Sequence, residues 1–410
     1  MSVSNGPLDR CIDARYPTET SVVLRYRHAF NFGETDAEDE QFKDLLKSTS
    51  IREGSRILPL LRYKGVEIHI LDETSLMHTR TLKAIDGCVT SARCKLAGLE
   101  RVALETGGNT GSALTAYATR AGVETFCFIP DENLGLLNSR LFVSSKAHLI
   151  SVEDPGLVKK CVRMFAKLNG LKRVPETAWR YEAARFRGLS IVEYILGHET
   201  FDWIAQTISA AFGPIGIYWA FRKFGRTVGK MPRFLGVQQE ANCPMYRSWK
   251  AGRRKLRPIN IRSTSRLLTR VMYDVKPHTY GTYKDLCSVL AETRGVLSTI
   301  NHDEFAALLA RNFDGKNIRD VLAGQDISIG ENIVEKTGLI AFAGILKAID
   351  SGTIRKGNRV LWCLTSGVTD ADGLARPEYT VRSLRGMMSE YRVQAPRASA
   401  MTGDSLRRIG

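Results

Sequence analysis

The feature that most constrains the fold of this chain is a glycine-rich turn between a short apolar run and an amphipathic helix pattern. Residues 101–105 (RVALE) are typical of a β-strand, and residues 106–111 (TGGNTG) of a turn. Residues 112–122 have the apolar stripe of a helix that ends at a glycine, and a second strand-like run follows at 124–130. This order predicts a βαβ unit whose glycine loop lies at the carboxyl end of its first strand, where open α/β sheets bind ligands.

The same alternation continues along most of the chain. Further strands are predicted at 57–63, 66–73, 147–152, 201–209, 232–238 and 358–367. Further helices are predicted at 83–99, 217–225, 284–295, 304–313 and 338–352. Strands that alternate with helices predict an α/β fold with open, mostly parallel twisted sheets flanked by helices. At 410 residues the chain is too long for one core, so we expect two domains or a large unit with a subdomain.

Composition excludes several classes of protein. With 43% hydrophobic and 25% charged residues the chain is neither disordered nor fibrous. No apolar run is long enough for a membrane span, and the first residues lack the layout of a signal peptide, so we expect a soluble cytoplasmic protein without a membrane partner. The eight cysteines never form a CxxC pair, which favours reduced, mostly buried thiols.

The net charge of +16 favours anionic partners. Nine basic residues lie between Arg247 and Arg270 with no acidic residue among them, and seven arginines follow from Arg376 to Arg408. Interleaved aromatic residues or a recognisable nucleic-acid module are missing, so nucleic acid is not the expected partner. A solvated loop and a loosely ordered tail, or steering of a small anionic substrate, are the remaining readings.

The glycine loop by itself leaves two interpretations open. Consecutive backbone amides at the start of a helix bind anionic oxygens, which points to a phosphate or carboxylate ligand. Gly107, Gly108 and Gly111 do not have the GxGxxG spacing, and no Walker lysine follows, so an ATP or NAD site is weakly supported. A tight strand-to-helix connection without a ligand explains the loop equally well.

The order of motifs around this loop resembles that of fold-type II pyridoxal phosphate (PLP) enzymes. Thr81-Leu82-Lys83 resembles their Ser-Phe-Lys, and Thr106 to Gly111 resembles their Ser/Thr-x-Gly-Asn-Thr loop one helix later. The resemblance implies that Lys83 is the Schiff-base lysine and that Asn109 contacts the cofactor's 3-hydroxyl. It also implies that the substrate carboxylate is held by the rest of the loop, namely Thr106, Gly107, Gly108 and Thr110.

Within this superfamily the chain is most similar to the threonine synthase and cysteate synthase branch. Residues 208–214 (ISAAFGP) resemble its phosphate loop, and 364–367 (LTSG) resemble the strand end whose hydroxyl faces the pyridine nitrogen. The resemblance implies phosphate contacts from Ser209, Ala210, Ala211, Phe212 and Gly213, and a pyridine contact from Thr365. A hydroxyl at that nitrogen suits β- or γ-elimination and replacement better than transamination.

The resemblance also implies a division of the chain into domains. It places a large PLP-binding domain at 56–87 and 186–372 and a small mobile domain at 88–185. An N-terminal extension at 1–55 and a basic C-terminal tail at 373–410 flank them. The segment after Cys11 resembles a degenerate metal ribbon, but a single cysteine cannot bind zinc in that way, so we expect no metal.

The chain departs from the family's pattern in both motifs. The charged pair that follows the lysine in Asn-Pro-Thr-Gly-Ser-Phe-Lys-Asp-Arg-Gly is absent after Lys83. Ala210 and Ala211 replace glycines of the phosphate loop, and Phe212 replaces a hydroxyl residue. A specialised substrate or weakened cofactor binding would follow from such changes.

The function implied is β-elimination and β-replacement, through an aminoacrylate, on a β-activated and phosphorylated amino acid such as phosphoserine. Arg80, beside Lys83, is a candidate contact for the anionic group of the substrate. The alternatives are threonine synthase-like γ-elimination and β-hydration of phosphohomoserine, and a catalytically silent protein that only binds a ligand. A homodimer is expected.

Overall fold

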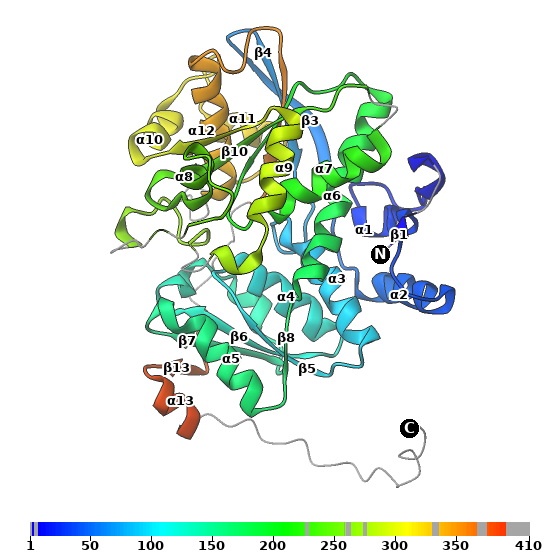
Figure 1. Ribbon diagram of the computed structural model, residues 1–410, viewed down its shortest axis with the longest axis vertical. Coiled ribbons are helices and arrows are strands. Elements are labelled where there is room, and N and C mark those ends of the chain that lie inside the picture. Colours follow the sequence, from blue (N-terminus) through cyan, green and yellow to red (C-terminus); the bar gives the residue numbers. More distant parts are fainter. Residues whose placement is uncertain are drawn as a thin grey trace.

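The computed structural model describes residues 2–3, 7–225, 229–257, 259, 264–273, 277–329, 336–366 and 375–390. The chain forms two α/β halves, each built on its own sheet (Figure 1). Of the positions singled out in the sequence, Arg262, Gly367 and the arginines beyond residue 390 lie outside the described residues. No helix in the described ranges is long and apolar enough to cross a membrane.

The large half is built on a six-stranded sheet in the order β11-β10-β9-β12-β4-β3. Its strands are β3 (Arg56–Tyr63), β4 (Val66–Asp72), β9 (Trp203–Thr207), β10 (Arg233–Gln239), β11 (Val296–Ile300) and β12 (Arg359–Leu364). All neighbours are parallel except β3, which pairs antiparallel with β4 at the edge. The fold class expected from the sequence is therefore present in this half.

Successive side chains of the central strands enter two different cores. On β9, Trp203 and Ala205 belong to one hydrophobic cluster and Ile204 to the other, and β12 alternates in the same way. Because neighbouring residues of a strand point to opposite faces, both faces of the sheet must be covered by helices. The helices of this half are α7 (Phe212–Phe224), α8 (Pro244–Lys250), α9 (Tyr283–Thr293), α10 (His302–Ala310), α11 (Ile318–Ala323) and α12 (Thr337–Asp350).

The small half is built on a five-stranded parallel sheet in the order β13-β7-β6-β5-β8. Its strands are β5 (Arg101–Glu105), β6 (Glu124–Pro130), β7 (Ala147–Val152), β8 (Lys172–Arg173) and β13 (Tyr379–Val381). Helices α4 (Asn109–Arg120) and α5 (Val158–Leu168) pack on it. Strands β5 and β6 with α4 are the βαβ unit predicted from the glycine loop.

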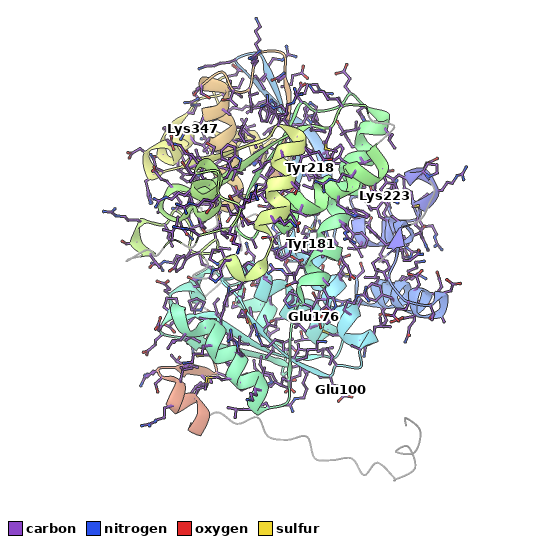
Figure 2. The ribbon with its side chains drawn as sticks, viewed as in Figure 1. Glu100, Glu176, Tyr181, Tyr218, Lys223 and Lys347 are labelled. Carbon is purple, nitrogen blue, oxygen red and sulfur yellow. The ribbon has the colours of Figure 1, made fainter. Side chains whose placement is uncertain are left out.

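Two helices lie between the halves. Helix α3 (Lys83–Leu96) follows the lysine motif and packs against α4, while α6 (Thr177–Gly197) runs from the small half to α7 of the large one (Figure 1). Figure 2 shows Glu176, just before α6, beside the small-half sheet and Tyr181 closer to the large half. The Tyr181 hydroxyl donates to Asp285 on α9 at 2.7 Å. These helices connect the two sheets on either side of the site described below.

The N-terminal segment packs as a cap on the helices between the halves. It contains β1 (Ser2–Val3), α1 (Val22–Arg25), β2 (Phe30–Asn31) and α2 (Asp36–Thr49). Buried aromatic side chains such as Phe30 and Phe42 belong to the same hydrophobic cluster as α6 and α7. The segment is therefore part of the core of the protein.

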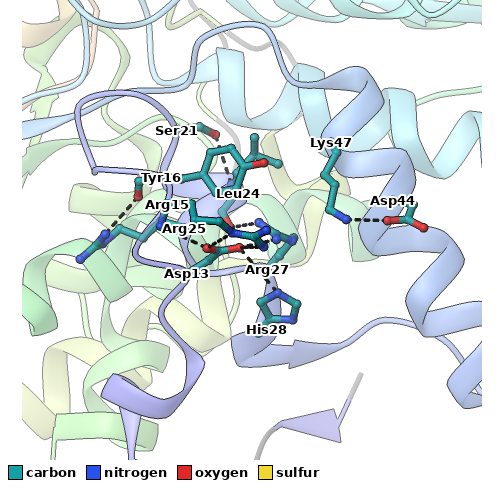
Figure 3. Close-up of polar contacts among 10 residues, drawn as sticks. All are labelled: Asp13, Arg15, Tyr16, Ser21, Leu24, Arg25, Arg27, His28, Asp44 and Lys47. Atoms are coloured by element: carbon teal, nitrogen blue, oxygen red, sulfur yellow. Dashed lines mark hydrogen bonds and ion pairs between the residues drawn. The ribbon is translucent and has the colours of Figure 1, made fainter.

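Buried charges fix this cap in place (Figure 3). Asp13 accepts hydrogen bonds from Arg15 at 2.7 and 2.9 Å and pairs with the buried Arg27. Arg25 donates through Nε to Glu193 of α6 at 2.8 Å. These arginines hold the pKa values of Asp13 and Glu193 below their usual ranges, in spite of the burial that opposes the shift at Glu193.

Residues 375–390, the part of the C-terminal tail that the structure describes, differ from the expected loose tail. Residues 379–381 form β13, which adds to the edge of the small sheet beside β7, and α13 (Leu384–Glu390) follows it. Val381 and Met387 are buried against α5. The sequence did not predict this strand, because three residues among many arginines give too short an apolar pattern.

Candidate functional site

A cavity of about 780 Å³ lies between the two halves, at the carboxyl ends of strands from both sheets. Most residues that the sequence singled out line it: Lys83, Thr106, Gly107, Gly108, Asn109, Thr110, Ser209, Ala210, Ala211, Phe212, Gly213 and Thr365. Segments separated by almost the whole chain thus meet around one space. Arg80 does not line the cavity; it lies in the turn before Thr81, with a positive φ of 57° and a buried Nε.

Lys83 is the first residue of α3 and extends into this cavity. Its Nζ donates to Asp86 Oδ2 at 2.8 Å, one helical turn later. Burial lowers the pKa of the lysine below its usual value, Arg180 and Arg187 lower it further, and Asp86 opposes the shift. An amine of this kind is a better nucleophile and base near neutral pH than a surface lysine.

The glycine loop turns from β5 into α4 around the Thr106 side chain. The hydroxyl of Thr106 accepts hydrogen bonds from the amides of Gly108 at 2.9 Å and Gly111 at 2.8 Å. Gly108, the residue directly before α4, has φ 149°, a conformation that residues with a Cβ atom rarely adopt. Residues 107–110 thereby bring the positive end of α4 to the cavity, which is suited to a carboxylate.

The expected phosphate loop lies at the start of α7. Ala211 precedes the helix in the left-handed conformation, with φ 62°, where an L-residue is strained. A Cβ atom at Gly213 would overlap Arg187 Nη1 and Gln206 Nε2, so any other residue there would force these two side chains to move. The Ser209 hydroxyl donates to the carbonyl of Met272 at 3.2 Å. The loop has the geometry of a glycine loop although two of its residues are alanines.

A buried ion pair supports this loop from beneath. Arg187 binds Glu73 through Nε and Nη2, and both side chains are 1% exposed. Its third nitrogen, Nη1, has no hydrogen-bond partner among the described residues, and the same holds for Gln206 Oε1. Buried polar atoms without hydrogen-bond partners cost free energy. Arg187 Nη1 and Gln206 Oε1 are therefore available to bind a polar group of a ligand.

The end of β12 places two hydroxyls at the cavity wall. The carbonyl of Thr365 accepts from the amide of Leu82 at 3.0 Å and from the hydroxyl of Thr81 at 3.1 Å, which ties β12 to the lysine segment. Ser366, the next residue, also lines the cavity, and its buried Oγ has no partner among the described residues. The sequence motif contained both residues, and the unpaired hydroxyl makes Ser366 a second candidate for the contact assigned to Thr365.

The charged wall of the cavity comes from residues that the sequence motifs did not identify. Besides Lys83, the lining cations are Lys159, Arg163, Arg173 and Arg180, against two carboxylates, Glu105 and Glu176. None of the described basic residues of 247–270 lines the cavity. Two small motifs could not reveal these cations, because they are brought together only by the packing of α5, β8 and α6.

Arg180 is the most constrained of these cations. Its guanidinium carbon lies 4.5 Å from the ring centroid of Phe212 and 5.3 Å from that of Tyr280. Its Nε is buried without a hydrogen-bond partner among the described residues. Phe212, which departs from the family pattern, thus provides an aromatic surface for an arginine.

A segment of the large half covers the glycine loop. Val271 packs over Gly107 and Gly108, and Met272 and Tyr273 line the cavity beside it. The segment is fixed to the small half at Glu132, whose carbonyl accepts from Arg270 at 3.0 Å and whose carboxylate accepts from Thr264 at 2.9 Å. The two halves therefore contact each other directly across the mouth of the loop.

Comparison with known proteins decides the family. Residues 52–284, more than half of the chain, match the family model described as pyridoxal-phosphate dependent enzyme. The chain belongs to this family. The expectations of an enzyme of the lyase type and of PLP as its cofactor are thereby confirmed.

Relatives and solved structures agree with this assignment. A cysteate synthase of Methanosarcina mazei is 24% identical over 319 residues, which cover 74% of this chain and 72% of the relative. A threonine synthase of Methanosarcina acetivorans is 23% identical over 278 residues, covering 66% and 62%. Diaminopropionate ammonia lyase from Escherichia coli shares the fold, with a TM-score of 0.58 at 15% identity over 88% of this chain and 93% of that one. O-ureido-L-serine synthase does so with a TM-score of 0.55 at 15% identity, over 79% and 91%.

The residues around the cavity of this PLP enzyme fit the cofactor. Lys83 supplies an amine of lowered pKa, and the amides at the start of α7 with Ser209 would hold the phosphate. Thr365 or Ser366 would meet the ring nitrogen, and the unpaired buried atoms of Gln206 and Ser366 offer further polar contacts. Ala211 has the left-handed conformation that glycine favours, so the loop at the start of α7 keeps a backbone path that a glycine would take and would still accommodate the phosphate.

Proposed function

We propose that this PLP enzyme performs β-elimination and β-replacement on an amino acid that carries an anionic, phosphorylated group at its β-carbon. Names of relatives such as cysteate synthase support the class of chemistry. The observation that carries the anionic substrate is Arg180, a cation of the cavity wall whose buried Nε has no hydrogen-bond partner among the described residues. Of the other lining cations, Lys83 pairs with Asp86 and Arg173 with Glu105, whereas Lys159 and Arg163 add to the positive charge of the wall. An anionic substituent on the substrate would give the Arg180 guanidinium a charged hydrogen-bond partner, which a neutral substituent would not.

The cofactor, when bound, withdraws electrons from Cα of the amino acid and so makes its proton easier to remove. The chain supplies the other requirements. The start of α4, residues 107–110, binds the substrate carboxylate, and Nζ of Lys83 accepts the Cα proton. Arg180 binds the anionic β-substituent, so that the bond that breaks is held beside Lys83.

Threonine synthase-like γ-elimination and β-hydration of phosphohomoserine is the second candidate. It is favoured by relatives named threonine synthase and needs the same anionic subsite. Because phosphohomoserine is one methylene longer than phosphoserine, the two proposals differ in the distance between the carboxylate loop and the anion subsite. They predict different products from the same cavity.

The test is a comparison of amino acids with the purified, cofactor-loaded full chain. We expect O-phosphoserine to change the visible absorption of the bound cofactor and to release inorganic phosphate faster than serine or O-acetylserine releases its substituent. Products are then screened with sulfite, sulfide and amines as nucleophiles. A rapid reaction with O-acetylserine and none with O-phosphoserine would exclude the anionic substrate, and threonine formed from phosphohomoserine would favour the second candidate.

The proposal includes a cytoplasmic homodimer, as in the sequence-based expectation. Light scattering of the purified chain measures the mass of the assembly. A mass near 45.7 kDa, that of one chain, would exclude the dimer.

A further inference from the structure

Asp86 occupies a position next to Lys83 that neither the sequence motif nor the comparisons assign. The family pattern has a carboxylate directly after the lysine, whereas this chain has Ala84 there, buried in the hydrophobic cluster. Asp86 lies one turn further along α3, on the same face as Lys83. It is 5% exposed, and Lys83 Nζ, at 2.8 Å, is the side-chain group hydrogen-bonded to its carboxylate among the described residues.

The surroundings of Lys83 otherwise oppose a positive charge on its amine. Burial and the guanidinium groups of Arg180 and Arg187 lower the pKa of Lys83, and its place at the first position of α3 adds the positive end of a helix dipole. Asp86 acts in the opposite direction, through both its charge and its hydrogen bond. It is thus the group that stabilises the ammonium form of Lys83.

We propose that Asp86 is the positioning residue of Lys83: its carboxylate orients Nζ toward the cavity and stabilises the ammonium that forms when Nζ takes up a proton. This inference rests on the proposed role of Lys83 but not on the identity of the substrate. The proton moves from the substrate Cα to Nζ and stays there until it is returned to the product or the leaving group. Asp86 takes no part in the transfer of the proton.

The network behind Asp86 keeps its charge balanced when Lys83 is neutral. Glu73 occupies Nε and Nη2 of Arg187 but leaves Nη1 without a partner. The Asp86 carboxylate is close enough to raise the pKa of Arg187, so part of its charge is compensated by that guanidinium.

The inference is tested on the full chain without cofactor, by the pH dependence of acetylation of Lys83. Mass spectrometry gives the rate at Lys83 relative to that at exposed lysines such as Lys47 in the same sample. Because Asp86 favours the ammonium form, Asp86→Asn should lower the pH midpoint of Lys83 labelling by about one unit or more. Below the midpoint this change appears as a roughly tenfold faster reaction at Lys83. Asp86→Glu should keep the wild-type midpoint to within a few tenths of a unit.

Glu182→Gln is the matched control. Glu182 is similarly buried and also pairs with a basic residue of α3, but that residue is Arg93, at 2.7 Å, and not Lys83. Its loss should leave the Lys83 midpoint unchanged. Superimposable profiles for the wild type and Asp86→Asn would overturn the inference, as would an equal shift in Glu182→Gln. If Asp86→Asn does not fold, a wild-type profile in Asp86→Glu supports the inference and a shift by a unit or more refutes it. Failure of O-phosphoserine to react would affect the proposed function alone.

Discussion

The guanidinium of Arg180 lies over the ring of Phe212, with 4.5 Å between its carbon and the ring centroid. Arg180 is on α6, which begins at the small half, and Phe212 is on α7, which begins at the expected phosphate loop. This contact gives a structural reason for Phe212, which departs from the family pattern. It also predicts that substrate choice depends on this pair.

Arg180→Gln should reduce kcat/KM for O-phosphoserine about 10- to 100-fold, because a lost hydrogen bond between charged groups costs about 1.5–3 kcal/mol. The value for O-acetylserine should change much less, since its substituent is neutral. Steady-state kinetics with both substrates measure the difference.

Arg185→Gln is the control for this variant. Arg185 is on the same helix and also lies over an aromatic ring, that of Trp219 at 4.7 Å, but does not line the cavity. Equal losses for both substrates in Arg180→Gln, or the same discrimination in Arg185→Gln, would contradict an anion subsite at Arg180.

Lys83→Ala should abolish covalent attachment of the cofactor and turnover while the chain stays folded, because the side chain that it removes is a nucleophile that lines the cavity. Borohydride reduction followed by peptide mapping should locate the pyridoxyl group on Lys83 in the wild type. Far-ultraviolet circular dichroism checks the fold. Full activity of the variant, or a pyridoxyl group on another lysine, would show that Lys83 is not the lysine that binds the cofactor.

Much of the fold could be predicted because its signals are local. The βαβ unit with its loop is predicted from the residues between Arg101 and Pro130 alone. Strands β9 and β12 are short apolar runs, which are typical of buried strands. Strand β11 was missed because its five residues, VLSTI, carry a weak pattern between two helices. Helix α7 was expected to begin at Ile217, since Gly213 and Pro214 suggest a turn, but proline is tolerated in the first turn of a helix.

The site could be predicted only in part, for a physical reason. Lys83 and the loop from Thr106 to Gly111 carry residue types whose chemistry is visible in sequence. Arg180 and Arg187 are ordinary charged residues of α6, and only the packing of α6 against α3 brings them to Lys83. Asp86 lies one turn after Lys83 on the same helix, and its spacing alone did not distinguish it from a surface ion pair. Arg80, chosen for its nearness in sequence, shows the converse, because a turn with positive φ places it away from the cavity.

Ala211→Gly should stabilise the protein by about 0.5–1 kcal/mol, because the left-handed conformation costs an L-residue more than glycine loses in entropy. Cofactor affinity should be retained or become tighter. Ala210→Gly is the matched control: Ala210 is not among the described residues with positive φ, so the change should destabilise by a similar amount. Thermal unfolding of both variants measures the two changes in stability, which should have opposite signs. Changes of the same sign would exclude strain at Ala211.

Substrate binding should draw the two halves together, because Val271 of the large half lies against the carboxylate loop and Arg270 binds Glu132 of the small half. Hydrogen exchange should slow at the amides of 106–111 and 264–273 when an amino acid binds. The N-terminal residues 36–49 of α2, outside the interface, serve as an internal reference. Identical exchange with and without the amino acid would argue against closure.

Acid should weaken the N-terminal cap through Asp13. Its pKa in the folded protein lies below the unfolded value because Arg15 and Arg27 bind the carboxylate. A carboxylate of this kind contributes stability above its unfolded pKa, near pH 4, and loses that contribution as the pH falls toward the folded pKa. Asp13→Asn should therefore lower the free energy of unfolding at pH 7, and the difference from wild type should shrink steadily below pH 4. Urea unfolding monitored by fluorescence at several pH values measures this difference. If the free energies of unfolding of wild type and Asp13→Asn differ by the same amount from pH 7 to pH 3, the ionised carboxylate does not stabilise the cap.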